Sequence, residues 1–236
     1  MKRTCLALAA LLSLSVNASV IMTNTRIIYP AAEPYTTIQF TNKGNLPYVM
    51  QLWTDSNNPD STPDDDNAPF IVAPVIFRIE PRSGQSARLH YIGKTLPQDR
   101  ESLFYLNFTQ IPPSNLGGEV NKLLLILKSR VKIFYRPSTI KGNPADIDRE
   151  LHFQFTRHKN EAILEIKNQA NFYASFARVA IKNQHYVWPV DIEMIAPQSG
   201  KSIIIKNMPP HISTPLKVEY TLINDVGRKI NHEASL

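Results

Sequence analysis

The segment 120–137 places an apolar run beside a series of basic residues. Five apolar residues, Leu123 to Leu127, lie between Lys122 and Lys128, and a basic segment rich in β-branched and aromatic residues follows. Nothing in this segment has the pattern of a catalytic site. A long strand of this composition suits the binding of another chain, because an exposed strand edge offers unpaired backbone groups and is otherwise an aggregation hazard.

Alternate residues of a strand lie on the same face. Leu123, Leu125 and Leu127 therefore share one face, and we expect Leu124 and Ile126 to face the protein's own core. A buried central strand is the alternative interpretation of such a run. A sandwich strand normally has one polar face, whereas both faces are apolar here, which favours a strand that also contacts a partner.

Leu127 and Lys132 are five residues apart, so strict alternation places them on opposite faces. Both side chains reach one ligand only if twist or a β-bulge near Ser129 redirects the strand. The sequence does not decide between these possibilities.

Motifs of catalysis and metal binding are missing from the chain. It contains no His-Glu-x-x-His, no nucleophile elbow and no phosphate-binding glycine loop. The acidic stretch Asp60 to Asp66 lacks the ligand spacing of a calcium loop, so we interpret it as a solvated loop. The six histidines show no metal-ligand spacing: His90, His152, His158, His185, His211 and His232. We expect a protein that is not an enzyme and needs no cofactor or metal.

The first 18 residues have the composition of a secretory signal peptide. Lys2 and Arg3 precede an apolar core, and residues 16–18 form a cleavage site with small residues. The apolar run is too short for a membrane anchor. Cys5 leaves with this segment, so the mature chain has no cysteine and no disulfide. We expect an exported, periplasmic protein that folds on its hydrophobic core alone.

The net charge gives little support for a nucleic-acid partner. The leader holds two of the 26 basic residues and none of the 20 acidic ones, so the mature formal charge is +4. The remaining basic residues are scattered along predicted strands of an exported chain.

The rest of the sequence predicts an all-β protein. Short runs of β-branched and aromatic residues are separated by Pro, Asn, Asp and Gly, and no window has a sustained helical period. The first series is 26–29, 36–40, 48–54, 71–79, 87–92, 103–111 and 123–135. The second series is 151–156, 162–168, 175–183, 192–195, 202–205 and 216–224. Seven short strands in about 115 residues are typical of an immunoglobulin-like sandwich.

We therefore predict two immunoglobulin-like β-sandwich domains in tandem. The first covers residues 19–137, because Pro137 removes a ladder donor and ends the seventh strand. Residues 138–148 have the composition of a linker, and residues 149–236 form the second domain.

Six segments in order along the chain resemble the periplasmic chaperones of the chaperone–usher pathway, which escort fimbrial subunits. The segments are Asn24–Pro30, Pro47–Trp53, Pro69–Pro74, Leu96–Asn107, Ser129–Pro137 and Ile223–Gly227. The resemblance implies that the two domains lie at an angle with a subunit-binding cleft between them. The short interval between the sixth and seventh strands resembles the subgroup that serves rod-forming fimbriae. The chain departs from the family pattern at Ala73–Val75 and Asn168–Ala170.

The resemblance also implies roles for particular residues. Arg26 and Lys132 match the two cations that anchor the subunit's C-terminal carboxylate in this family. The donor-strand motif falls on three leucines: Leu123, Leu125 and Leu127. An ionic cluster between the domains falls on three charged residues: Glu101, Arg136 and Asp225.

The resemblance implies fimbrial subunits and an outer-membrane usher as partners, without nucleic acid or direct membrane anchoring. Lending a strand to a subunit is donor-strand complementation. The alternative is that the chain is itself a fimbrial subunit or adhesin. That class has an N-terminal donor extension and usually a disulfide, and the mature chain has no cysteine. The sequence does not decide whether the free protein self-associates.

Overall fold

A computed structural model describes residues 20–65, 68–93, 95–113, 126–158, 161–209 and 215–236. The predicted signal peptide, Leu123, Leu124 and Leu125 lie outside these residues. Across the described residues, no helix has both the length and the apolar character needed to cross a membrane.

The first nine strands form a β-sandwich of two sheets. One sheet has the order β1 (Val20–Met22), β3 (Thr36–Asn42), β7 (Gly84–Tyr91) and β5 (Phe70–Ala73). The other has the order β2 (Ile27–Pro30), β9 (Leu127–Arg136), β8 (Ser102–Ile111), β4 (Tyr48–Asp55) and β6 (Ile76–Ile79). Alternate side chains from both sheets form one core, which includes Phe40, Leu52, Leu89, Leu106 and Ile133.

The segment 71–79 is two strands, so the prediction of one strand there is wrong. β5 pairs with β7 in the first sheet, and β6 pairs with β4 in the second. Pro74 lies between them and has no N–H to donate to a ladder. The chain therefore changes sheets at this point, and the hydrophobic pattern continues on both sides of the change.

The second sandwich begins after a short 3-10 helix, η2 (Pro144–Glu150). Its smaller sheet has the order β10 (Leu151–His158), β11 (Glu161–Asn168) and β15 (Ser199–Ile205). The other has the order β13 (Val187–Val190), β12 (Ala174–Lys182), β16 (Lys217–Ile223) and β17 (Lys229–Ser235), and β14 (Met194–Ile195) also pairs with β12. Leu164, Ile166, Ile181, Ile195 and Val218 belong to its core.

The sequence did not predict three of the described strands: β1, β13 and β17. β13 contains Pro189, and a proline weakens the sequence signal of a strand. β17 is a largely exposed edge strand with few apolar residues. Edge strands bury little surface, so their sequences carry a weak hydrophobic pattern.

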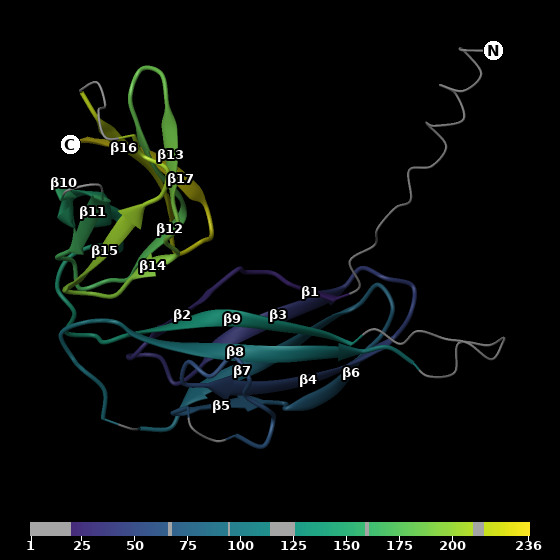
Figure 1. The fold of residues 1–236 in the computed structure, drawn as a ribbon. Coiled ribbons are helices and arrows are strands. Elements are labelled where there is room, and N and C mark those ends of the chain that lie inside the picture. Colours follow the sequence, from purple (N-terminus) through teal and green to yellow (C-terminus); the bar gives the residue numbers. More distant parts are fainter. Residues whose placement is uncertain (1–19, 66–67, 94, 114–125, 159–160, 210–214) are drawn as a thin grey trace, which may run out of the picture.

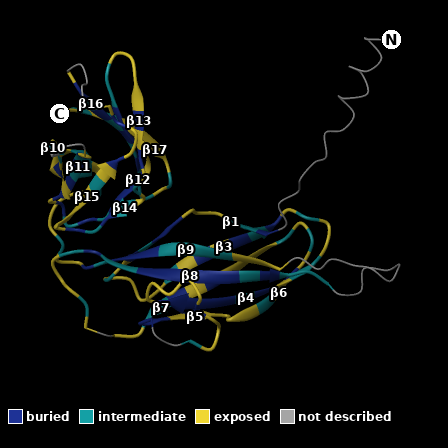
Figure 2. Cartoon of the chain, in the orientation of Figure 1, coloured by how far each residue is buried: buried dark blue, intermediate teal, exposed yellow. Residues whose placement is uncertain are grey.

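The two sandwiches lie at an angle, and the chain passes between them after β9 (Figure 1). The ends of β2 and β9 lie next to the second sandwich, near β12 and β14 (Figure 1). Buried positions follow the central strands of both sandwiches, and exposed positions gather in the loops and edge strands (Figure 2). This arrangement confirms the predicted fold of two immunoglobulin-like domains.

Candidate functional site: an open strand edge beside a charged interdomain cleft

One edge of β9 is only partly covered. Its ladder with β8 runs from Tyr135, opposite Ser102, to Leu127, opposite Gln110. On the other side, β2 pairs only with Ile133 to Arg136. In the described part of the chain no strand pairs with this side of residues 127–132. Their backbone groups are therefore available to another strand.

The free edge begins with exposed apolar side chains. Leu127 is 55% exposed and its neighbour Ile126 is 54% exposed. Val131 and Ile133, two and three alternations further on, pack in the core of the first sandwich. Leu127 therefore lies on the core-side face of β9, beyond the end of the home core.

The register of β9 shows whether Leu127 and Lys132 lie on the same face of the strand. The ladder between β8 and β9 has no register shift over nine pairs, so there is no β-bulge at Ser129. Leu127 and Lys132 lie on opposite faces of an uninterrupted strand. The same alternation places Ile126 on the outer face, so the expectation that Ile126 faces the home core is wrong.

Arg26 and Lys132 lie at neighbouring positions of the sheet. Ile27 pairs with Ile133 in the parallel ladder between β2 and β9, and both are buried in the core. The preceding residues, Arg26 and Lys132, therefore lie on the opposite, outer face. Arg26 Nη1 donates a hydrogen bond to the carbonyl of Ile223 in the second domain at 3.0 Å. The structure thus brings both predicted anchors to the interdomain side of β2 and β9.

Arg26 is a buried cation, with 8% of its surface exposed. Burial lowers the pKa of its guanidinium, and the charges of Asp225 and Glu101 offset part of that effect. Its Nε has no hydrogen-bond partner among the described residues. A buried donor without a partner is costly, so this guanidinium retains capacity to bind an acceptor.

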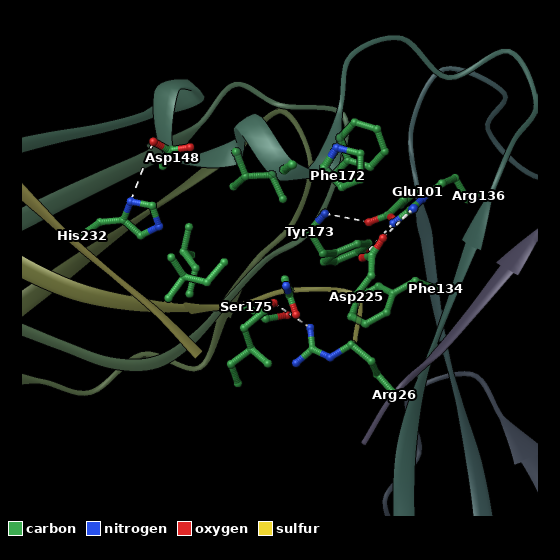
Figure 3. Close-up of a pocket in the computed structure, with 17 residues that line it drawn as sticks. Arg26, Glu101, Phe134, Arg136, Asp148, Phe172, Tyr173, Ser175, Asp225 and His232 are labelled. Atoms are coloured by element: carbon green, nitrogen blue, oxygen red, sulfur yellow. Dashed lines mark hydrogen bonds and ion pairs between the residues drawn. The ribbon is translucent and has the colours of Figure 1, made fainter. Parts of the chain in front are cut away.

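The predicted ionic cluster is assembled across the two domains (Figure 3). Arg136 Nη2 and Nε donate to Glu101 Oε1 at 2.6 and 2.9 Å. Arg136 Nη1 and Nη2 donate to Asp225 Oδ2 and Oδ1 at 2.8 and 3.1 Å. Charge-assisted bonds of this bidentate kind fix geometry as well as adding free energy.

Glu101 is the buried member of this cluster, with 4% exposure. Its Oε2 accepts a hydrogen bond from the backbone N–H of Tyr173 in the second domain at 2.8 Å. Burial raises the pKa of Glu101, and Arg136 counteracts this only in part. Arg136 also lies over the ring of Phe172, 5.1 Å from its centroid. The cluster therefore connects β9 to the second domain through charge, hydrogen bonds and an aromatic contact.

A cavity of about 130 Å³ lies beside the cluster, between the domains (Figure 3). Arg26, Phe134 and Arg136 line it from the first domain, and Ser175 and Asp225 from the second. Ser175 Oγ is buried and has no partner in the part of the chain that is described. No group of three or more possible metal-ligating residues occurs among the described residues.

A second polar network lies on the outer face of β9. Arg130 donates to Asp55 Oδ1 at 2.6 Å and to Oδ2 at 3.1 Å, and its guanidinium lies 3.3 Å from the ring centroid of Tyr105. Asn107 Nδ2 donates to Asp55 Oδ2 at 2.6 Å. No sequence motif predicted this network. Its signal was the presence of Asp55 and Asn107 inside apolar strands, since buried polar residues need partners.

The ion partner of Lys132 was also missed. Lys132 Nζ forms an ion pair with the carboxylate of Glu193, which lies in the second domain just before β14. No sequence pattern joins two surface residues that are 61 positions apart. The pairing depends on how the two domains are placed.

The fold and this site define a class: a two-domain immunoglobulin-like protein with an open strand edge next to an interdomain cleft lined by charged side chains. Residues 19–141 match the N-terminal domain of the PapD pili and flagellar-assembly chaperones. Residues 146–234 match the C-terminal domain of the PapD pili-assembly chaperones. The chain belongs to this family of pilus-assembly chaperones.

Individual relatives agree over nearly the whole chain. The chaperone protein FimB/FhaD of Bordetella pertussis is 33% identical over 98% of this chain and 93% of its own length. The probable fimbrial chaperone YadV of Escherichia coli is 31% identical over 99% of this chain and 94% of its own. The YadV crystal structure has a TM-score of 0.78, with coverage of 93% of this chain and 100% of YadV.

A further solved structure contains a partner. The SafB chaperone of Salmonella enterica, crystallised with the SafA pilin, matches with a TM-score of 0.75 and 26% identity, over 94% of this chain and 98% of the matched chain. The chain therefore has a chaperone role in pilus assembly. This decides against the alternative that it is a fimbrial subunit or adhesin.

Proposed function

We propose that this chaperone binds fimbrial subunits in the periplasm by lending them β9 as a strand, and that it delivers them to an outer-membrane usher. The observation that carries the proposal is the free edge of residues 127–132, which ends beside Arg26 and Lys132. Binding folds and caps the subunit, and the protein catalyses no reaction. The pilin bound to SafB supports subunits as the partner class.

Main-chain hydrogen bonds from the free edge join the two chains. They depend little on side chains, so one chaperone accepts several related subunits. A subunit strand that pairs here extends the sheet. Leu127, on the core-side face, then lies under the extended sheet and enters the subunit's apolar interior.

The three leucines supply the apolar part of the free energy of binding. A strand that extends over residues 123–127 in the complex places Leu123, Leu125 and Leu127 on one face. Burial of a Leu side chain contributes about 1.5–3 kcal/mol, so three contribute roughly 5–9 kcal/mol as an upper bound. A slip of one residue turns all three away from the subunit.

Arg26 and Lys132 bind the subunit's C-terminal carboxylate and so fix the register. Both lie on the outer face, where β2 begins to pair with β9. Leu127 and Lys132 therefore contact different parts of the subunit: its apolar interior and its chain end. Charge-assisted hydrogen bonds between cations and a carboxylate suit this role.

The remaining parts of the proposal concern export and domain organisation. Residues 1–18 direct export and are removed. Residues 19–137 hold the subunit, residues 138–148 link the domains, and residues 149–236 complete the cleft. Glu101, Arg136 and Asp225 hold the two domains at a defined angle.

The test is co-expression with a fimbrial subunit from the same operon, followed by pull-down. Arg26→Ala and Lys132→Ala should each reduce capture at least tenfold while circular dichroism stays that of the folded protein. The matched control is Arg78→Ala on β6, an exposed arginine far from the cleft edge. Capture at wild-type strength by the Arg26→Ala, Lys132→Ala double variant contradicts the carboxylate anchor.

A further inference from the structure

Lys132 is already occupied by a carboxylate in the protein without a partner. Its ammonium forms an ion pair with Glu193, although the two residues belong to different domains. The Lys132 side chain is 21% exposed, whereas the Glu193 side chain is 78% exposed. The pair therefore lies at the solvent-accessible mouth of the cleft, where another carboxylate reaches the same ammonium.

The backbone of Glu193 is held in place, whereas its side chain is largely exposed. The N–H of Phe176 in β12 donates to the carbonyl of Glu193 at 2.7 Å. The next residue, Met194, pairs with Ser175 in the ladder between β12 and β14. The carboxylate thus projects toward β9 from a fixed point. Because its side chain is largely exposed, it can swing into water when Lys132 takes another ligand.

The charges around Glu193 favour its ionised form. The hydrogen bond and charge of Lys132 lower its pKa, and the charges of Lys201 and Arg130 add to the effect. Among the ion pairs of the described residues, Glu193 is the carboxylate that pairs with Lys132. The arrangement matches the chemistry of the proposed ligand, because a glutamate carboxylate and a chain-terminal carboxylate are the same acceptor.

We propose that Glu193 is an internal competitor that occupies Lys132 in the free protein and is displaced by the terminal carboxylate of a bound polypeptide. The inference rests on the proposed function, since it deepens the role of Lys132 as an anchor. Two carboxylates on one ammonium repel each other, so the incoming group replaces Glu193 rather than joining it.

The competition makes Lys132 selective for carboxylates at the end of a strand. An isolated carboxylate gains only Lys132 and must displace Glu193, so it exchanges one ion pair for another. A carboxylate at the end of a strand also contacts Arg26, and its strand pairs with the free edge of β9. The free energy of these contacts favours displacement of Glu193. Glu193 therefore screens out acidic groups that are not at the end of a strand, such as small acids and side chains of other proteins.

The first test examines the pair itself and does not depend on subunit binding. The pKa of Glu193 is measured in the full mature chain by NMR, from the pH titration of its side-chain carboxyl ¹³C signal. Lys132→Met should raise this pKa toward the value of an ordinary glutamate. An unchanged pKa in Lys132→Met overturns the inference.

The second test measures competition with a synthetic peptide of alternating apolar residues, prepared with a free C-terminal carboxylate and as its amide. Glu193→Gln should bind the carboxylate form about two- to fivefold more tightly than the wild type, the range expected for loss of a surface ion pair. Affinity for the amide should stay unchanged. Asp191→Asn, an exposed carboxylate two residues away, is the matched control and should bind like the wild type.

The outcomes separate the two proposals. If the wild type prefers the carboxylate form but Glu193→Gln binds it no more tightly, Glu193 is not a competitor and the anchor still stands. If the wild type binds both forms equally, the anchor itself fails, and the competitor role fails with it.

Discussion

Arg136, the last residue of β9, donates two hydrogen bonds to Asp225 in the second domain, at 2.8 and 3.1 Å. The same strand begins at Leu127 with a free edge. One continuous strand therefore carries the proposed binding edge at one end and the contact between the domains at the other.

Removal of Asp225 should weaken the contact between the domains. Asp225→Ala leaves Arg136 paired with Glu101, so the loss is partial, about 1–2 kcal/mol in the free energy of unfolding by urea. Small-angle X-ray scattering should show a changed or broadened distribution of interdomain distances. The control is Asp64→Ala in an exposed loop. A scattering profile and unfolding curve like those of the wild type would count against the clamp.

Removal of Glu101 should lower the free energy of unfolding more than removal of Asp225. Its side chain is 3% exposed, against 40% for Asp225, and it accepts bonds from both Arg136 and the N–H of Tyr173. Glu101→Ala leaves the N–H of Tyr173 without its acceptor and leaves Arg136 with only the more exposed Asp225. We expect a loss of more than about 2 kcal/mol in the free energy of unfolding. Urea unfolding of both variants checks the order. Equal or reversed losses would show that burial does not set the strength of this cluster.

Asp55 should make the free energy of unfolding of the first domain depend on pH in the acidic range. Burial pushes the pKa of Asp55 up, but hydrogen bonds from Arg130 and Asn107 outweigh it and hold the pKa below the ordinary 3.8. The unfolded chain therefore takes up a proton at a higher pH than the folded one. The free energy of unfolding falls as the pH drops from about 5 through 3.8 toward the lowered pKa.

Urea unfolding at several pH values, with Asp55→Asn as the variant, measures this contribution. Asp55→Asn should lose this part of the pH dependence and about 2–3 kcal/mol of stability at pH 7, because Arg130 loses its partner. Asp64→Asn, which changes an exposed carboxylate, is the control. If Asp55→Asn keeps the wild-type slope between pH 5 and 3, Asp55 does not cause it.

Leu127 and Ile126 form a matched pair for the donor edge. Their exposures are 55% and 54%, but alternation places them on opposite faces. Leu127→Lys should weaken subunit binding about 10- to 100-fold, corresponding to loss of about 1.5–3 kcal/mol of apolar burial. Ile126→Lys should weaken it much less, and both variants should keep wild-type stability within about 0.5 kcal/mol.

Surface plasmon resonance with an immobilised subunit measures both affinities. Equal losses for the two variants would mean that the partner does not distinguish the faces of β9. The assignment of the three leucines to one binding face would then be wrong.

The fold was largely predictable because each buried strand carries an alternating apolar pattern. The sandwich architecture followed from these strands. The pattern failed where burial is weak, as in β17, and where the chain changes sheets, as between Ala73 and Ile76. Hydrophobicity records whether a residue is buried, but it does not record which sheet buries it.

The site was predictable only where residues match a family motif. The structure brings Glu101, Arg136 and Asp225 together and places Arg26 beside Lys132, whereas their roles stay predictions. Glu193 matches no such motif. Its contact with Lys132 depends on the angle between the domains, and no local pattern encodes that angle.

The point where β2 joins β9 also limits the length of edge that a guest strand can occupy. Because β2 occupies the edge from Ile133 onward, a guest strand has residues 127–132 available in the described structure, or about 20 Å at roughly 3.3 Å per residue. A guest that ends beside Lys132 must run in the same direction as β9. A longer tail would meet β2, so β2 sets the position beyond which a guest strand cannot extend along this edge.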